Sequence, residues 1–256
     1  MQWIYLSPHF DDVALSCGGL VWEQTNSEDS VSIWTICAGD PPEGEFSSFA
    51  QKLHERWGTG AHAMAQRRQE DIESCLILSA AYYHFGIPDC IYRRLEPING
   101  DTRQGEQINN KFLITSEEDL YGEPHPLEIL LIRRLCEDLK DSFPNHANIV
   151  APFGFGKHVD HLLTRYAAEE TGRNLWFYQD YPYILGNLDQ LSEMESSGWK
   201  RKLFKISEEA TQAWMESVLA HRSQRSTFWT DDEAVEESIH YYLGLSGGIC
   251  LWKKLK

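Results

Sequence analysis

Five short apolar runs lie within the first 180 residues and predict β-strands. They are too short for helices and are rich in β-branched or aromatic residues, which favour strands. The predicted strands cover residues 3–6, 31–38, 82–85, 148–151 and 175–179.

Segments with helical spacing lie between these runs. Apolar positions three and four residues apart predict helices over 13–24, 61–80, 127–141 and 159–171. Alternating strands and helices predict a Rossmann-like α/β fold, with a mainly parallel sheet and helices on both faces. In such sheets, ligands bind at the carboxyl ends of the strands.

The last third of the chain predicts strands over 200–206 and 248–252 and helices over 208–221 and 232–243. A chain of 256 residues is close to the upper limit for one hydrophobic core. We therefore expect a single domain over 1–256, with 181–256 as its C-terminal extension.

Two stretches, 39–60 and 86–115, are rich in Gly, Pro, Asn and other loop-forming residues. We expect the first to be a long loop, and the pattern assigns no element to the second. Because long loops in compact domains usually carry function, we expect both to shape a binding pocket.

The chain carries 39 acidic and 23 basic residues, a formal net charge of −16. This field repels nucleic acids and anionic lipids. No apolar run approaches the roughly 18 residues of a membrane span, and residues 1–5 lack the basic stretch of a signal peptide. Six scattered cysteines fit reduced thiols. We expect a cytoplasmic protein without nucleic-acid or membrane partners; a homo-oligomer is compatible with the sequence.

The first cluster of reactive side chains follows the first predicted strand. His9, Asp11 and Asp12 place an imidazole and two carboxylates within four residues. His9 and Asp12 are three residues apart, so one turn can aim both at one point. Imidazole and carboxylate suit Zn²⁺ and related divalent metals. Taken alone, the segment fits equally well a turn in which Asp12 caps the next helix.

A second cluster follows the predicted strand at 148–151. His158, Asp160 and His161 open the next helix. Alone, this is better explained as a capped helix with two surface histidines. Taken together, however, the two clusters lie at strand ends that meet on one edge of a parallel sheet. Two histidines and a carboxylate then form a three-ligand site with an open position for water, as in catalytic zinc sites.

Weaker candidates lie between the two clusters. Arg67 on the 61–80 helix could contact polar substrate oxygens, and Asp89 follows the third predicted strand. A charged helix face and a turn explain them as well. A local basic patch around Arg67, Arg68, Arg93 and Arg94 would favour anionic substrates despite the acidic chain.

The order of these motifs resembles the PIG-L/LmbE family of metal-dependent N-deacetylases. That family has a His-Pro-Asp-Asp-Glu motif after the first strand and a His-x-Asp-His motif about 150 residues later. Here the two motifs read His-Phe-Asp-Asp-Val from His9 and His-Val-Asp-His from His158. An Arg-x-x-Glu helix (Arg67, Glu70) and a Gly-x-Pro-Asp turn ending at Asp89 lie between them. The match covers roughly residues 1–180.

The resemblance implies that His9, Asp12 and His161 hold one metal ion per chain. Zinc is the expected metal, and Fe²⁺ and Mn²⁺ suit the same ligands. The implied fold is Rossmann-like, in agreement with the strand and helix pattern.

The resemblance also implies roles in catalysis. Asp11 would be the general base. His158 would stabilise the oxyanion or act as an acid, with Asp160 orienting it. Arg67 and Asp89 would contact a sugar-like substrate.

The sequence departs from the family pattern at three places. Phe10 replaces the usual Pro, and Val13 replaces the usual Glu; neither position is a metal ligand. Some members have a Tyr shortly before the second motif, whereas residues 155–157 contain none. We expect that this tyrosine is either absent or supplied by Tyr181 or Tyr183.

We therefore expect a zinc-dependent hydrolase that removes an N-acyl group, with acetyl expected, from an amino sugar or its conjugate. Another metal-dependent hydrolase or an Fe(II) enzyme would use similar ligands. A metal-binding or sugar-binding module without catalysis is the third alternative. The presence of Asp11 and His158 argues against that loss.

Overall fold

The computed structural model describes residues 1–58, 62–94 and 112–255. A seven-stranded sheet in the order β3-β2-β1-β4-β5-β7-β6 forms its centre. The strands are β1 (Gln2–Ser7), β2 (Ser30–Thr35), β3 (Ala81–His84), β4 (Asn148–Pro152), β5 (Leu175–Tyr178), β6 (Trp199–Phe204) and β7 (Ile249–Lys254).

The first five strands are parallel. From β1, the chain first builds outward to β2 and β3 and then returns to add β4 and β5 on the other side. The strand order therefore reverses between β1 and β4, which pair directly. Ligands bind at such switch points, beyond the carboxyl ends of the strands. Both predicted motifs follow these two strands.

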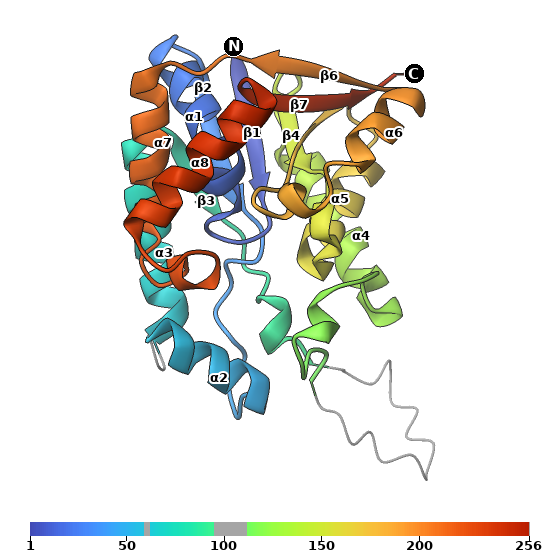
Figure 1. Cartoon of the computed structure of the whole chain (residues 1–256). Coiled ribbons are helices and arrows are strands. Elements are labelled where there is room, and N and C mark those ends of the chain that lie inside the picture. The colour runs from blue at the N-terminus through green and yellow to red at the C-terminus, as the bar shows by residue number, and fades with distance from the viewer. Residues whose placement is uncertain (59–61, 95–111, 256) are drawn as a thin grey trace.

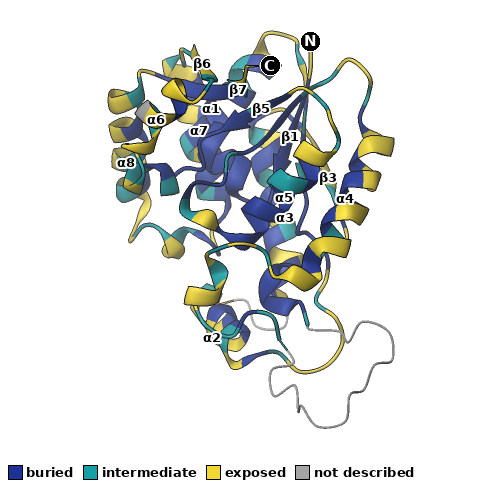
Figure 2. Ribbon diagram, turned by 90° about the vertical axis from the view of Figure 1, so that its right-hand side faces the viewer, coloured by how far each residue is buried: buried dark blue, intermediate teal, exposed yellow. Residues whose placement is uncertain are grey.

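Helices cover both faces of the sheet, which confirms the predicted fold class (Figure 1). Helices α1, α3 and α7 pack together on one face, and α4 and α5 pack on the other. Figure 2 shows the sheet buried between them, while α4 exposes its outer side. The helices are α1 (Asp12–Asn26), α2 (Ser48–Trp57), α3 (Ala63–Ile77), α4 (Ile129–Ser142), α5 (Val159–Glu170), α6 (Gln190–Ser196), α7 (Glu208–Ala220) and α8 (Asp232–Ser246).

The C-terminal region joins the same sheet. β7 pairs antiparallel with β5 and with β6. Helix α7 packs against α1, where the buried indole of Trp214 donates a hydrogen bond of 3.1 Å to the carbonyl of Leu15. A Cβ at Gly18 would lie 2.6 Å from that indole, so glycine permits this close approach.

The expectation of a long loop over 39–60 is wrong, because the segment contains helix α2. The hydroxyl of Ser47 accepts a hydrogen bond from the backbone N–H of Ala50 and caps the start of α2. Gly58 ends it in the left-handed conformation, with φ of 66°. In Figure 1, α2 lies beyond the carboxyl ends of the strands.

Two further features of the sequence can be compared with the structure. The second loop-rich stretch, 86–115, falls largely outside the described residues. In the part of the chain that the structure describes, no helix is long and apolar enough to cross a membrane.

Candidate metal centre and active site

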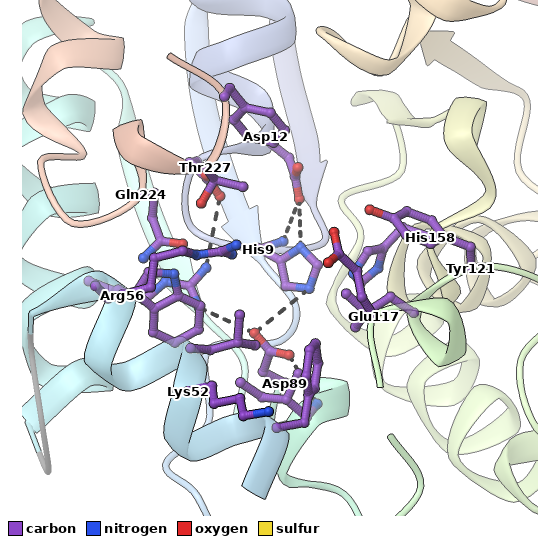
Figure 3. Close-up of a pocket in the computed structure, with 18 of the residues that line it drawn as sticks. His9, Asp12, Lys52, Arg56, Asp89, Glu117, Tyr121, His158, Gln224 and Thr227 are labelled. Carbon is purple, nitrogen blue, oxygen red and sulfur yellow. Dashed lines mark hydrogen bonds and ion pairs between the residues drawn. The ribbon is translucent and has the colours of Figure 1, made fainter. Parts of the chain in front are cut away.

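A cavity of about 400 Å³ opens at the carboxyl ends of the central strands (Figure 3). Its floor consists of the segment after β1, the start of α5, and the side chains of Arg67 and Asp89. Its walls come from α2, residues 117–121, Tyr183 and residues 224–228.

The two motifs converge on this floor. One carboxylate oxygen of Asp12 lies 3.2 Å from Nδ1 of His9, and the other lies 3.2 Å from Nε2 of His161. Each of these three residues is more than nine-tenths buried. One ring nitrogen each of His9, His158 and His161 lies within 4.8 Å of the others. Residues about 150 positions apart thus present ligand atoms to a single point.

In both His9 and His161, the ring nitrogen that does not face Asp12 contacts another buried carboxylate. Nε2 of His9 lies 3.0 Å from Asp160, and Nδ1 of His161 lies 2.7 Å from Asp180. Metal-binding histidines typically donate their second N–H to a carboxylate, which fixes the ring and its tautomer. The donor set therefore fits a divalent metal held by the inner ring nitrogens and Asp12.

Asp180 was not among the predicted site residues. It follows β5 directly, and its carboxylate accepts hydrogen bonds from the backbone N–H groups of Gly154 and Phe155. These bonds fasten the turn that precedes His158. The signal that revealed the two motifs, an acidic residue at the carboxyl end of a parallel strand, also applies to Asp180.

The buried charges shift the pKa values of these groups strongly. Burial lowers the pKa of His161, but Asp12 and Asp180 outweigh it and raise the pKa to about 9. Burial raises the pKa of Asp12, but His161 and His9 hold it well below its usual range. At neutral pH the metal-free protein therefore holds a protonated His161 against an ionised Asp12, and metal binding would have to release that proton.

His158 behaves differently from the other two histidines. Burial and the neighbouring charges of His9 and His161 lower its pKa to about 3, so the ring is neutral. Its Nδ1 accepts a 3.2 Å hydrogen bond from the backbone N–H of Asp160. The single ring proton is therefore on Nε2, and the ring lines the cavity. His158 can donate this proton to an oxygen atom of a ligand.

Asp160 contacts His158 through its backbone rather than through its carboxylate. Its carboxylate contacts His9, accepts a 3.0 Å hydrogen bond from the backbone N–H of Cys90, and pairs with Arg93 at 2.6 Å. Arg93 also pairs with Glu128 at 2.7 Å. Asp160 thus ties a metal-facing histidine to a buried ion-pair network.

Asp11 precedes Asp12 in the chain and lines the cavity. Burial and the charge of Asp12 raise the pKa of this carboxyl group, while Arg67 opposes the rise. A guanidinium nitrogen of Arg67 lies 4.0 Å from Asp11, and another lies 3.2 Å from Asp89. Both predicted substrate-contacting residues, Arg67 and Asp89, therefore line the same floor.

The predicted basic patch does not form a free cationic surface. Arg67 pairs with Asp89, Arg68 with Asp40, and Arg93 with Asp160 and Glu128. Arg94 donates to the backbone carbonyl of Glu45. Each of these four arginines is paired with a carboxylate or a backbone carbonyl. The spacing of the arginines in the sequence does not reveal these partners.

The two tyrosines considered for the missing position differ in location. Tyr183 lines the cavity, and its ring meets that of His161 edge-on with centroids 5.7 Å apart. A Cβ at Gly156 would lie 2.8 Å from the Tyr183 ring, so glycine allows this approach. The hydroxyl of Tyr181 instead hydrogen-bonds to Ser238 at 2.5 Å.

Comparison with known proteins identifies a family and individual proteins to which this chain is similar. A family profile described as PIG-L, GlcNAc-PI de-N-acetylase, matches residues 4–171. A 2'-N-acetylparomamine deacetylase from Niallia circulans is 28% identical over 214 residues, which is 77% of this chain and 72% of the relative. One from Streptomyces fradiae is 25% identical over 249 residues, which is 93% of this chain and 77% of the relative.

Solved structures show the same fold. The zinc-inhibited form of a teicoplanin deacetylase superposes with a TM-score of 0.74 at 22% identity, covering 100% of this chain and 98% of the other. At this identity, the likeness supports the fold alone.

Proposed function

This chain belongs to the PIG-L family, and from that premise we propose that it is a zinc-dependent hydrolase that removes an acetyl group from an amino sugar or its conjugate. The observation that supports this most is the convergence of three side chains: Asp12, which lines the cavity, contacts both His9 and His161, and the outer ring nitrogen of each histidine contacts a buried carboxylate. The names of the relatives, which are deacetylases of amino sugar compounds, support the same reaction.

In this proposal, His9, Asp12 and His161 hold one divalent ion per chain. Such an ion, when bound, makes water a usable nucleophile near neutral pH and polarises a carbonyl oxygen. Zinc suits a site of two imidazoles and one carboxylate with an open position.

Asp11 takes the proton from the attacking water. Its carboxylate lies beside Asp12 in the cavity, and burial raises its pKa, which favours a group that accepts and later returns a proton. Arg67 holds Asp11 and Asp89 in place from the other side. Asp11 then gives the proton to the departing amine.

His158 stabilises the developing negative charge on the carbonyl oxygen. The ring is neutral and its proton is on Nε2, so His158 can donate a hydrogen bond to that oxygen without changing its own protonation state. Arg67 and Asp89 contact the sugar hydroxyls at the floor of the cavity.

The test is acetate release from N-acetylated amino sugars and their glycosides. We expect release by the zinc-loaded protein, loss after chelation, and recovery when zinc is restored. Release that persists after complete metal removal would contradict the proposal. So would a fully loaded protein that releases acetate from no N-acetylated sugar.

A further inference from the structure

Helix α2 presents one complete face to the cavity. Of its ten residues, five line the cavity, and they are spaced at i, i+3, i+4, i+7 and i+8. These residues are Phe49, Lys52, Leu53, Arg56 and Trp57. Of these, Lys52 and Arg56 lie on the side of the cavity away from His158 (Figure 3). The floor can hold the N-acetyl sugar, so α2 faces whatever is attached to that sugar.

The apolar part of this face is held in position. The Trp57 ring lies between the guanidinium of Arg67, 5.0 Å from its centroid, and the ring of His54, 5.7 Å away at 29°. Phe49 packs with the small hydrophobic cluster that also contains Leu53 and Tyr92. Across the cavity, Tyr121 and Phe228 add aromatic surface. An aromatic group would bury apolar area against these walls.

The cationic part of the face has no partner among the described residues. Lys52 and Arg56 are exposed, and neither forms an ion pair or hydrogen bond there. Like charges four residues apart on a helix repel each other. The position in the last turn of α2 can stabilise Arg56 through the helix dipole but does not explain Lys52, whereas Arg67, Arg68 and Arg93 all have acidic partners.

The charged residues differ between the floor of the cavity and its mouth, the part formed by α2, residues 117–121 and residues 224–228. On the floor, Asp12 contacts two histidines and Asp89 contacts Arg67. At the mouth, the only described acidic residue that lines the cavity is Glu117, opposite the two cations of α2. The mouth therefore has an excess of positive charge in a chain of net charge −16.

We propose that the α2 face is a subsite for an aglycone that joins an aromatic body to an anionic group, a carboxylate or a phosphate. The aromatic body would stack on Phe49, Leu53 and Trp57, and the anionic group would pair with Lys52 and Arg56. The inference rests on the proposed deacetylase function, because it names the substrate class of the same site. A cationic aglycone of the same shape would be repelled.

Three matched probes test this inference. They are the phenyl, 4-carboxyphenyl and 4-(aminomethyl)phenyl glycosides of N-acetylglucosamine, with acetate release measured on the zinc-loaded enzyme at low ionic strength. We expect kcat/KM for the carboxyphenyl glycoside to exceed that for the phenyl glycoside by about fivefold, as expected for two exposed ion pairs. The preference should shrink as salt is raised, because salt screens exposed charges.

Substitutions then locate the effect. Lys52→Ala combined with Arg56→Ala should reduce the carboxyphenyl-to-phenyl ratio to about one. With Lys52→Glu and Arg56→Glu, kcat/KM for the aminomethyl glycoside should exceed kcat/KM for the carboxyphenyl glycoside. The matched control is Arg134→Ala with Lys140→Ala, which removes the same charge from exposed positions on α4 and should keep the parent ratio.

Binding separates this inference from the proposed function. Dissociation constants of the three probes, measured by calorimetry on Asp11→Asn, should show the same order without turnover. A parent ratio of one, or a ratio unchanged by the double alanine variant, would overturn the subsite. Absence of acetate release from every probe would overturn the deacetylase instead, while the order of the binding constants would still decide for or against the subsite.

Discussion

The floor and the mouth of the cavity are built in different ways. On the floor, the side chains follow strands β1, β3 and β4 or, for Arg67, come from α3; they are largely buried and contact partners of opposite charge. At the mouth, they come from α2, 117–121 and 224–228, and those of Lys52 and Arg56 reach solvent. The parallel sheet dictates the position of the floor, whereas the segments added around it determine the mouth.

This difference separates chemistry from selectivity. Buried and mutually bonded groups keep a fixed geometry, which a reaction centre needs. Exposed groups on a helix beyond the sheet can change without disturbing that geometry. We therefore expect substitutions on the floor to affect metal binding and turnover, and substitutions at the mouth to affect which conjugate is used.

The largest effect is expected at the proposed base. Asp11→Asn keeps the shape of the side chain but removes its ability to accept a proton, so kcat should fall by about 10²–10⁴-fold. Zinc content should remain near one per chain, because Asp11 is not a proposed ligand. Steady-state kinetics with elemental analysis on the same sample checks this. Full activity with bound metal would refute the role of Asp11.

A smaller effect is expected one contact away from the metal. Asp180→Asn weakens the hydrogen bond that orients His161, so zinc affinity should fall by about 10–100-fold. Competition with a chromogenic chelator measures this. Asp189→Asn, an exposed substitution in the same segment, is the control and should leave affinity unchanged. Equal affinities for all three proteins would show that the contact does not tune the floor.

The anchoring of the mouth can be tested through Glu70. Its buried carboxylate accepts hydrogen bonds from the backbone N–H and hydroxyl of Ser223, next to the wall at 224–228. Glu70→Ala leaves these donors unpaired, so the free energy of unfolding should fall by about 1–3 kcal/mol. Glu73→Ala is the control, because its ion pair with Arg222 is exposed and contributes little. Denaturant unfolding that does not distinguish the two variants would contradict this anchor.

The stability of the metal-free protein should also change with pH. His161 has a pKa of about 9 in the folded, metal-free protein and about 6.5 when unfolded. Its contribution is thus complete below pH 6.5 and is lost as pH rises through 9, by at most about 1.4 kcal/mol per pH unit. Denaturant midpoints of the metal-free protein between pH 6 and 9.5 measure this. His161→Gln should remove that part of the slope; an unchanged slope would contradict the assignment.

Much of the floor could be predicted from the sequence, because a parallel sheet brings the ends of its strands together. His9, Asp12 and His161 follow from that rule and from the family resemblance, and the structure brings them together. Asp180 obeys the same rule, but it stands without a neighbouring histidine in the sequence. Its position depends on the turn at Gly154, because its carboxylate accepts a hydrogen bond from the backbone N–H of Gly154.

The mouth was less accessible to sequence reasoning. Helix α2 follows a Gly- and Pro-rich stretch, and two of the five residues on its cavity face are charged, which obscures the apolar periodicity of a packed helix. The pairing of Arg93 with Glu128 and Asp160 joins residues 35 and 67 positions apart and leaves no local signal. The assumed loop and the assumed basic patch failed for these two reasons.

The central claim is that the carboxyl ends of β1 and β4 converge on one divalent metal. Elemental analysis of the parent protein beside His161→Ala and His146→Ala tests it most directly, because His146 is an exposed histidine before β4. We expect about one zinc per chain in the parent and in His146→Ala, and loss of zinc in His161→Ala. Full zinc content in His161→Ala, or no metal in the parent even after reconstitution with zinc, iron or manganese, would contradict it.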